Sequence, residues 1–474
     1  MIMIFPYAGY MSMYLLPSGM ATPANVGYYA GCLSSVFMLG RFPTAYLWGH
    51  AADTYGRIGV LQTVLVFSAF FSILFGTSTS FAMALVWRTC LGAVNALVST
   101  TKTAAQEIGR GQPQLERRAM GLVLGMRSWA LLMEPALGGF LAEPWKQYPS
   151  LEKHIAVTHP WIHGLLSTYP FLLPNLLIAV LCLTTCLAIH LWVPETLVNR
   201  RSLGKDVVAW WRALPATNHA PSTFEERQSL LPQQLGKEKS LADSKDDNPV
   251  PSSKIAVWER PLTRQHLVLH WAFSFVSTYI DEAFPLFCLS ALHLNEANIG
   301  KILSGAGVLF AALQYVSFAT LTHYLGLYKC LWLGCMLGTT FVAFLPLAAI
   351  SPLGMPVFLI GVVCMGMTKV MHSLFFVSMA VAINKTVESH QRAKMNALGL
   401  TGNSVVKAAG PLLAGSMVAW CFTGTWWRLS GENGGWVVFG IVPIMGCIVA
   451  SRVTALEKAV VAATVPRNED TIEK

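Results

Sequence analysis

The feature that most constrains this chain is a series of eleven apolar runs, each long enough to cross a membrane. A hydrocarbon core of about 30 Å requires roughly 20 predominantly apolar residues in a helix. Charged residues make up only 12% of the 474 residues, about half of the share in a typical soluble domain. The sequence therefore predicts an all-α membrane protein and excludes a soluble enzyme. Five runs cover residues 26–48, 58–76, 81–101, 120–141 and 169–193, and six cover residues 266–289, 299–320, 327–350, 355–383, 395–421 and 434–450.

The N-terminal segment and the middle of the chain define the domain organisation. Residues 1–16 are apolar but too short to cross the hydrocarbon core, so we interpret them as the outer part of a first helix whose beginning is absent from this chain. Residues 197–265 are rich in Ser, Pro, Gln and charges of both signs, which is typical of a largely disordered linker. We therefore predict a six-helix bundle at 1–196, a linker at 197–265, a second six-helix bundle at 266–451 and a tail at 452–474.

The distribution of basic residues predicts the orientation in the membrane. Of the 33 Lys and Arg residues, 24 lie in alternate loops, the linker and the tail, whereas the opposite loops hold four. Basic loops are retained in the cytoplasm, so the linker and both termini are expected there. This bias also explains the net charge of +9 without a nucleic-acid partner, and the lipid bilayer is the expected surrounding.

Two short matches between the halves predict an internal repeat. Pro135-Ala136-Leu137-Gly138-Gly139 corresponds to Pro411-Leu412-Leu413-Ala414-Gly415, at an offset of 276 residues, and Gly56 corresponds to Gly326 at an offset of 270. Small residues allow helices in a membrane to approach closely. Helix packing is therefore the expected role of Pro135, Gly138, Gly139, Gly410 and Pro411.

A polar motif joins the second and third predicted spans. Its sequence is Gly49-His50-Ala51-Ala52-Asp53-Thr54-Tyr55-Gly56-Arg57. Gly49 and Gly56 permit a tight turn, while Asp53 and Arg57 can cap helix ends or pair across a gate that opens and closes. By itself the motif is equally consistent with a turn that only connects two helices.

In a chain with six spans on each side of a linker, this motif resembles the signature loop of the major facilitator superfamily. Further matching residues are Gly27-Tyr28-Tyr29-Ala30-Gly31, Phe37-Met38-Leu39-Gly40-Arg41, Trp48-Gly49, Pro135 through Ala142, Pro194-Glu195-Thr196, Asp281-Glu282-Ala283-Phe284-Pro285-Leu286 and Lys407-Ala408-Ala409-Gly410-Pro411. Within the superfamily, the sequence is most similar to the twelve-span drug:proton antiporters and, among them, to the zinc-induced-facilitator-like group. The resemblance implies two pseudo-symmetric bundles and alternating-access transport of a small organic solute, such as an organic acid, a metal chelator or a drug-like molecule, coupled to protons.

Eight ionisable residues fall inside the predicted spans. A charge at the bilayer centre costs about 2.5–3.5 kcal/mol or more, so each one requires a partner, a water-filled cavity or a neutral form. Fixed ion pairs that brace neighbouring helices are the alternative to a functional role. The eight residues are Arg41, Arg88, Arg127, Glu134, Asp281, Glu282, Lys369 and Lys407.

Glu134 and Arg88 are the leading candidates for proton coupling. Arg88 and Gly92 match the superfamily's basic motif in the fourth span, and the resemblance implies a role in proton coupling. Glu134 stands where the antiporter motif usually has Gly before the proline, so this chain gains a titratable group there. We expect Glu134 to carry or gate the proton, with Arg88 and Arg127 setting its proton affinity. A structural ion pair is the alternative.

The second half contributes candidates for proton coupling and for a substrate cavity. Asp281 and Glu282 are adjacent and point about 100° apart on a helix, and the resemblance favours Glu282 as the residue that faces the cavity. A contact of either carboxylate with Lys407 is conceivable. Lys369 and His372 share a helix face that could engage an anionic solute. Arg41 from the first half is assigned to the same cavity.

The remaining signals concern targeting and cofactors. Glu226, Leu230 and Leu231 in the linker resemble an acidic dileucine sorting signal, which predicts a sorting adaptor as partner and a vacuolar or endolysosomal location. The plasma membrane is the alternative location. The sequence indicates no cofactor, metal site or enzymatic constellation. A uniporter or symporter of the same fold, and a non-transporting receptor or scaffold, remain the alternatives to an antiporter.

Overall fold

The computed structural model describes residues 2–108, 133–195, 260–351, 354–386, 392–423 and 434–464, together with residues 115, 126 and 130. All regular structure in these ranges is helical, which confirms the predicted all-α class. Eight of the described helices are long and apolar enough to cross a membrane. Most of the predicted fifth span, residues 196–259 and the tail after residue 464 lie outside the described residues, whereas residues 261–265 of the predicted linker already belong to a helix.

The helices of the first half follow the predicted spans. The predicted span at 26–48 is part of one 30-residue helix, α2. The segment at 133–141, which ends the predicted fifth span, is also helical. The elements are η1 (Ile2–Ile4), α1 (Ala8–Leu15), α2 (Val26–Tyr55), α3 (Arg57–Gly76), α4 (Phe81–Ala93), α5 (Leu97–Ile108), α7 (Pro144–Gln147), α8 (Pro149–Thr158), α9 (Pro160–Thr168) and α10 (Leu172–Trp192).

The second half contains long helices at all six predicted spans. The first, α12, again has 30 residues, and a short 3₁₀ segment continues α14. The elements are α12 (Pro261–Ser290), α13 (Glu296–Leu325), α14 (Leu327–Thr340), η4 (Phe341–Phe344), α15 (Leu347–Ile350), α16 (Met355–Lys385), α17 (Arg392–Thr423) and α18 (Gly434–Thr464).

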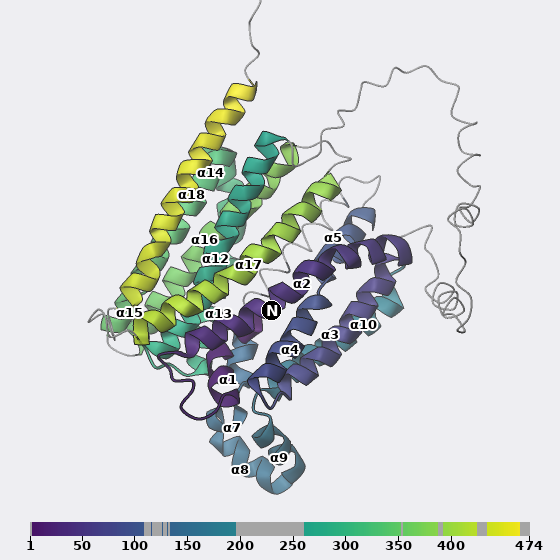
Figure 1. Cartoon of the computed structure of the whole chain (residues 1–474), viewed down its shortest axis with the longest axis vertical. Coiled ribbons are helices and arrows are strands. Elements are labelled where there is room, and N and C mark those ends of the chain that lie inside the picture. The colour runs from purple at the N-terminus through teal and green to yellow at the C-terminus, as the bar shows by residue number, and fades with distance from the viewer. Residues whose placement is uncertain are drawn as a thin grey trace, which may run out of the picture.

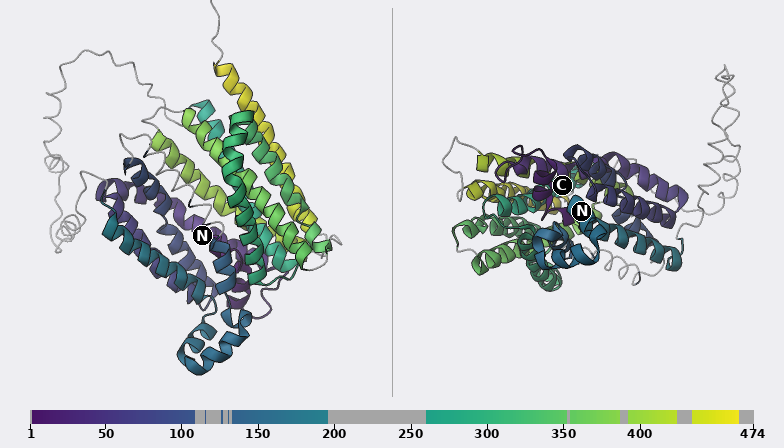
Figure 2. Two further views of the ribbon diagram at one scale, coloured as in Figure 1. Left: turned by 180° about the vertical axis from the view of Figure 1, so that it is seen from behind. Right: turned by 90° about the horizontal axis from the view of Figure 1, so that it is seen from below.

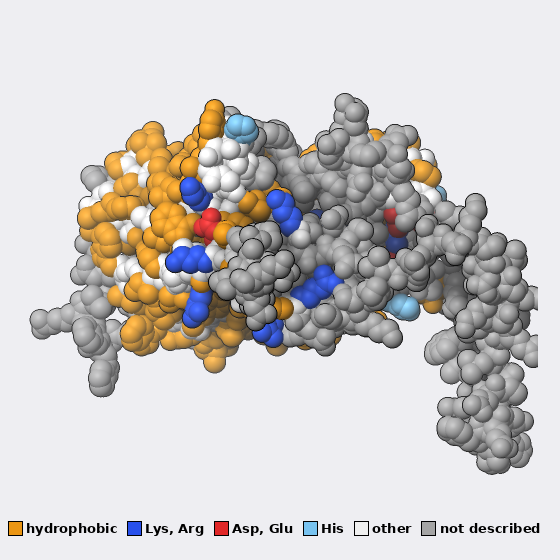
Figure 3. Space-filling model, turned by 90° about the horizontal axis from the view of Figure 1, so that it is seen from above, with side chains coloured by type: hydrophobic (Ala, Val, Ile, Leu, Met, Phe, Trp, Pro, Cys, Tyr) orange, Lys and Arg blue, Asp and Glu red, His pale blue; other side chains and the backbone are white. Residues whose placement is uncertain are grey.

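The two halves form neighbouring groups of helices with distinct ends. Figures 1 and 2 show the first half, in purple and blue, beside the second half, in teal to yellow, with α7, α8 and α9 projecting from one end. We call this end the α7–α9 side and the opposite end, where the α2–α3 and α13–α14 turns lie, the turn side. Basic side chains gather on the turn side while the flanks are hydrophobic, as expected for a protein that crosses a membrane (Figure 3).

One glycine in each half makes the same helix–helix corner. Gly56 joins α2 to α3 with φ of 106°, and Gly326 joins α13 to α14 with φ of 79°. Only glycine adopts this backbone region without strain, which is why a glycine recurs at an offset of 270 residues. The two corners agree with the predicted repeat.

Close backbone contacts join the halves toward the α7–α9 side. Helices α2 and α17 cross where Gly27 faces Gly415, and a Cβ atom on Gly415 would lie only 2.0 Å from the Gly27 carbonyl oxygen. Gly31 approaches the Pro411 carbonyl in the same way. No larger side chain fits at these points, so the helices touch through their backbones.

A second contact of this kind joins the segment 133–141 to α13. A Cβ atom on Gly139 would lie 2.5 Å from the Glu296 carbonyl oxygen and 3.0 Å from Gly300 Cα. The other predicted packing residues also sit at tight contacts within their own half: Gly138 against the Met3 carbonyl and Gly410 against Thr278. Two close backbone contacts thus join the halves, one between α2 and α17 and one between the segment 133–141 and α13.

Replacing Gly415 by Ala should destabilise the protein by about 1–3 kcal/mol, because the added methyl group overlaps the backbone of α2. Gly440→Ala on α18 is the matched control, since a Cβ atom there meets nothing within 4 Å. Thermal unfolding of the two purified variants in detergent gives the comparison. Equal unfolding temperatures would show that the α2–α17 contact is looser than described.

Candidate functional site

Arg88 is the central charge of the candidate site. It lies on α4, its side chain is only 6% exposed, and its guanidinium carbon lies 4.9 Å from the Phe37 ring centre and 5.4 Å from that of Phe75. Aromatic faces stabilise a cation in a medium that solvates it poorly. Gly92, one turn further along α4, allows this helix to contact the Phe37 backbone directly. The motif of Arg88 and Gly92 therefore places a buried cation beside the interface.

Two carboxyl groups from different halves act electrostatically on Arg88. Glu282 lies on α12 of the second half and is 2% exposed, whereas Glu134 belongs to the first half and is half-buried. The Tyr7 hydroxyl, near α1, is a third neighbour of Arg88. The structure thus brings together Arg88, Glu134 and Glu282, three residues expected to take part in proton coupling. Arg127, the fourth, lies outside the described residues.

The Glu282 carboxyl group is poorly satisfied by hydrogen bonds. The Ser34 side chain interacts with this carboxyl group, whereas Glu282 Oε2 is buried without a hydrogen-bond partner within the described part of the chain. Burying an ionised carboxylate without hydrogen bonds is costly unless a counter-charge lies nearby. Its neighbouring charges are Arg88 across the interface and Asp281 in the same helix. Glu282 can therefore exist either as the counter-ion of Arg88 or as a neutral acid.

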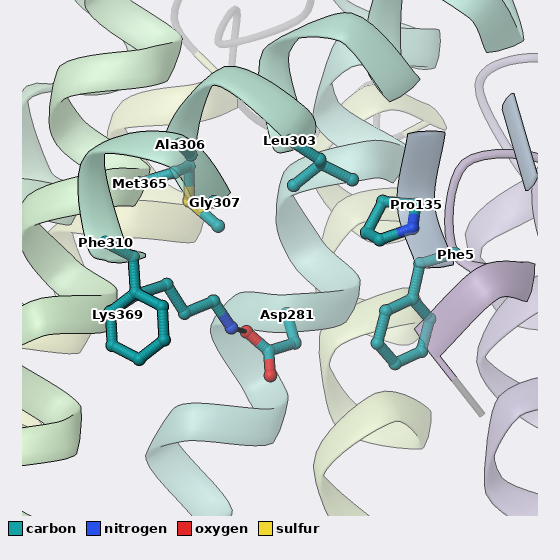
Figure 4. Close-up of a pocket in the computed structure, with 9 residues that line it drawn as sticks. All are labelled: Phe5, Pro135, Asp281, Leu303, Ala306, Gly307, Phe310, Met365 and Lys369. Carbon is teal, nitrogen blue, oxygen red and sulfur yellow. Dashed lines mark hydrogen bonds and ion pairs between the residues drawn. The ribbon is translucent and has the colours of Figure 1, made fainter. Parts of the chain in front are cut away.

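Asp281 makes an ion pair with Lys369 of α16. Figure 4 shows the two side chains pointing at each other beside a small pocket. Both are largely buried, and this partner of Asp281 differs from Lys407, which the sequence suggested. The pocket is lined by Phe5, Pro135, Asp281, Leu303, Ala306, Gly307, Phe310, Met365 and Lys369.

The pocket combines apolar walls, one cation and one anion. The space open to the centres of water molecules is about 30 Å³, which is room for a few waters and not for an organic solute. Residues of both halves line it, since Phe5 and Pro135 face the ion pair from the first half. Admission of a solute therefore requires the helices around the pocket to separate.

His372 does not line this pocket, although it shares α16 with Lys369. Its Nδ1 atom lies 3.2 Å from Ser277 Oγ, and its ring packs edge-on against Phe273 at 4.8 Å. The side chain is buried within the second half, so its helix face is turned away from the interface. Lys407 and Arg41 are half-buried on α17 and α2 and are also absent from the pocket lining. Of the four residues assigned to the cavity, only Lys369 lines the described pocket.

On the turn side, Arg57 is the centre of an ion network. Its guanidinium group donates hydrogen bonds to Asp53 Oδ1 at 2.6 Å and to Glu107 Oε1 at 2.9 Å. The described partners of Arg57 thus come from α2 and α5, both in the first half. The network ties helices within one half together, whereas the sequence also suggested pairing across a gate.

Glu195, just beyond α10, completes this corner. Its carboxylate accepts hydrogen bonds from the backbone N–H groups of Arg57, at 2.8 Å, and Ile58, at 3.1 Å. A carboxylate in this position satisfies free N–H groups of α3 and complements its dipole. A Cβ atom on Gly56 would lie 2.4 Å from Glu195 Oε2, so glycine is required for space as well as for φ, while Gly49 lies in the open.

Sequence reasoning missed the roles of Glu107 and Glu195. Glu107 is the only acidic residue in α5, and Glu195 is the only one between residues 153 and 196. An isolated carboxylate at the end of an apolar span is a usable signal of an interaction. A charge there is costly unless a cation or the N–H groups of a helix N-terminus lie beside it. The predicted sorting signal, Glu226, Leu230 and Leu231, lies outside the described residues.

Glu195→Ala should destabilise the protein by about 1–2 kcal/mol, because the first N–H groups of α3 lose their acceptor. Asp53→Asn should cost no more than about 1 kcal/mol, since Asp53 is 69% exposed and Arg57 keeps Glu107. Thermal unfolding in detergent measures both. A larger loss of stability in Asp53→Asn than in Glu195→Ala would contradict the prediction that the Glu195 hydrogen bonds stabilise the protein more.

Two helical bundles that enclose buried charges at their common interface define a membrane transporter. A family model described as "Major Facilitator Superfamily" matches residues 1–371, so the chain belongs to the major facilitator superfamily, as the sequence predicted. Members of this family are carriers without enzymatic activity, and this chain is accordingly a multi-pass transporter and not an enzyme.

Named relatives and solved structures agree with this assignment. The chain is 31% identical over 414 residues to Protein ZINC INDUCED FACILITATOR-LIKE 1 of Arabidopsis thaliana, covering 84% of this chain and 76% of the relative. It is 26% identical over 402 residues to the "Probable peptide/nitrate transporter At3g43790" of the same plant, with the same coverage. A bacterial homologue of the human lysosomal transporter Spinster, inward-facing and occupied, superposes with a TM-score of 0.65 at 11% identity, covering 98% of this chain and 95% of that one, which shows the shared fold.

Proposed function

We propose that this protein is a proton-coupled antiporter of a small organic solute that works by alternating access. The observation that carries the proposal is the electrostatic interaction between two buried groups, Arg88 in the first half and Glu282 in the second half. Because the two residues belong to halves that move relative to each other in alternating access, the protonation of Glu282 depends on the relative position of the halves. Glu134 adds a second carboxyl group beside the same cation.

The coupling follows from electrostatics in a medium of low dielectric. Ionised Glu282 attracts Arg88 and favours the arrangement in which the halves are in contact at this point. Protonation removes this attraction, so the halves separate at a lower cost and the proton can leave on the other side. Burial disfavours both separated charges, which keeps the pair from opening unless a proton or a solute compensates.

We propose that the solute carries a carboxylate group and an apolar part, as an organic acid, a carboxylate-bearing metal chelator or an amphiphilic drug does. Lys369 can bind that carboxylate in place of Asp281, and Phe5 and Phe310 of the pocket supply apolar contacts. Relatives named for zinc-induced facilitation and for peptide or nitrate transport are compatible with such a solute. The proposal requires no cofactor.

The proposed membrane location and orientation rest on the sequence. We propose a vacuolar, endolysosomal or plasma membrane location, with both termini in the cytoplasm and a sorting adaptor at the linker. Basic side chains on the turn side support this orientation.

Glu282→Gln should abolish proton coupling, because the amide cannot release a proton and does not neutralise Arg88. Glu134→Gln should shift the pH profile of transport without abolishing it, since Glu134 is less buried. The test uses purified protein in liposomes with an internal pH dye, a pH gradient and a panel of benzoate, citrate and ethidium. Glu152→Gln on α8, a partly exposed carboxylate that pairs with His163, is the control.

Four outcomes separate the alternatives in this assay. Solute-dependent proton flux lost only in Glu282→Gln supports the antiporter. Solute uptake without proton movement indicates a uniporter, and co-directional flux of solute and protons indicates a symporter. Proton coupling that persists unchanged in Glu282→Gln contradicts the proposed site.

Lys369→Met should lower the uptake of a carboxylate solute by about tenfold or more, because a charge-assisted hydrogen bond contributes about 1.5–3 kcal/mol. The double variant Lys369→Met with Asp281→Asn removes both charges and keeps the buried site neutral, so it controls for misfolding. Initial rates of uptake for benzoate and for ethidium in the same vesicles give the measurement. Equal losses for the acid and for the cation would argue against carboxylate recognition by Lys369.

A further inference from the structure

A second pair of ionisable groups meets between the halves, away from Arg88. Glu143 precedes α7 in the first half, and Glu296 is the first residue of α13 in the second half. Their carboxyl groups lie within hydrogen-bonding reach of each other on the α7–α9 side. Neither residue belongs to the motifs that the sequence singled out.

Both side chains are removed from solvent. Glu143 is 5% exposed and Glu296 is 3% exposed. The ammonium group of Lys146, itself 74% exposed, donates to both Glu143 oxygens at 2.7 and 2.8 Å. Glu296 Oε1, in contrast, is buried and has no hydrogen-bond partner in the described ranges. The site thus contains two carboxyl groups and one partner cation, and that cation bonds to Glu143.

Such a pair is stable only when it holds a proton. Two ionised carboxylates side by side repel each other, and the repulsion is strong where water is excluded. One proton on Glu296 removes the repulsion and allows its hydroxyl group to donate a hydrogen bond to the Glu143 carboxylate. The proton comes from the water on the α7–α9 side and returns to it when the pair separates, so no other reactant is needed.

The contact exists only while the halves are packed together on this side. The backbone around Glu296 rests on Gly139, so the carboxyl pair and the close helix contact form at the same place. On the first-half side, Glu143 is fixed in a left-handed backbone conformation, with φ of 46°, and its N–H donates to the Pro170 carbonyl oxygen at 3.0 Å. Separation of Gly139 from α13 therefore pulls the two carboxyl groups apart.

We infer that Glu143 and Glu296 form a proton-binding latch that closes the α7–α9 side of the transporter when one proton is bound between them. The inference rests on the proposed alternating access but concerns a different pair of residues from the one that couples transport. A proton taken up here favours closure on this side, and loss of the proton favours opening.

Other titratable groups near the latch define the necessary controls. Lys146 on α7 and the Tyr10 hydroxyl of α1, which donates to the Leu294 carbonyl oxygen, interact with the pair. The Cys288 thiol of α12 is a further neighbour of Tyr10. His163 of α9 stacks on Trp145 of α7 and pairs with Glu152, so its own titration has to be separated from that of the latch.

The test measures the distance between the halves directly. Spin labels introduced through unnatural amino acids at Ser150 on α8 and Lys301 on α13, both exposed, report opening of the α7–α9 side in the full chain. In the parent, raising the pH from 5 to 8.5 should convert a narrow, short distance distribution into a longer one. Glu296→Gln keeps the hydrogen bond to Glu143 without needing a proton, and should hold the short distance over the whole range.

Matched variants decide the origin of any pH effect. Glu143→Gln should behave as Glu296→Gln does and also covers the case in which the latter fails to fold. Glu152→Gln and His163→Gln, on the same side and paired with each other, should keep the parental pH dependence. Any one of three results would overturn the latch. They are a distance in the parent that does not change with pH, a Glu296→Gln variant that opens at high pH as the parent does, and loss of the pH effect in His163→Gln.

The distance measurement needs neither solute nor a proton gradient. Failure of the latch in this assay therefore leaves the Arg88–Glu282 proposal intact. If the parent protein shows no proton coupling in liposomes but its distance distribution changes with pH as expected, only the antiporter proposal is overturned.

Discussion

The cost of burying charge in a membrane determines where the functional groups of this protein lie. Every intramembrane charge needs a counter-charge or a neutral form, and the residues that could carry chemistry meet where the two bundles face each other. Arg88 is flanked by aromatic rings and approached by Glu282 from the opposite half, while the Asp281–Lys369 pair lines a pocket to which both halves contribute. A relative movement of the bundles therefore changes the environment of these charges.

Glycine contacts define how closely the two bundles are held against each other. Backbone contact between Gly27 and Gly415, and between Gly139 and Gly300, joins the bundles toward the α7–α9 side. On the turn side, the described partners of Arg57 belong to its own half, so that network stiffens one bundle. The alternating access that we propose would rock one bundle against the other, as in transporters built from repeats.

Particular residues show how far sequence reasoning reaches. The positions of the spans and the corners at Gly56 and Gly326 could be predicted, because length, hydropathy and a backbone that only glycine adopts are local properties. The pairing of Asp281 with Lys369, in place of Lys407, could not, because several helices offer a cation at a similar depth. His372 shares a helix face with Lys369 in projection, yet it packs into the second bundle against Phe273. The roles of four carboxylates could not be predicted either, because they depend on residues distant in the chain. These carboxylates are Glu107, Glu195, Glu143 and Glu296.

The sequence by itself determined that this chain is a helical membrane protein and to which superfamily it belongs, and it predicted two related halves. It did so because a bilayer imposes helix length and polarity on each span separately, and because family motifs are short and continuous. Only the tertiary structure decided which charges face one another. That choice depends on the rotation of each helix about its axis and on how closely the backbones approach, and both are set by packing between segments up to several hundred residues apart in the chain.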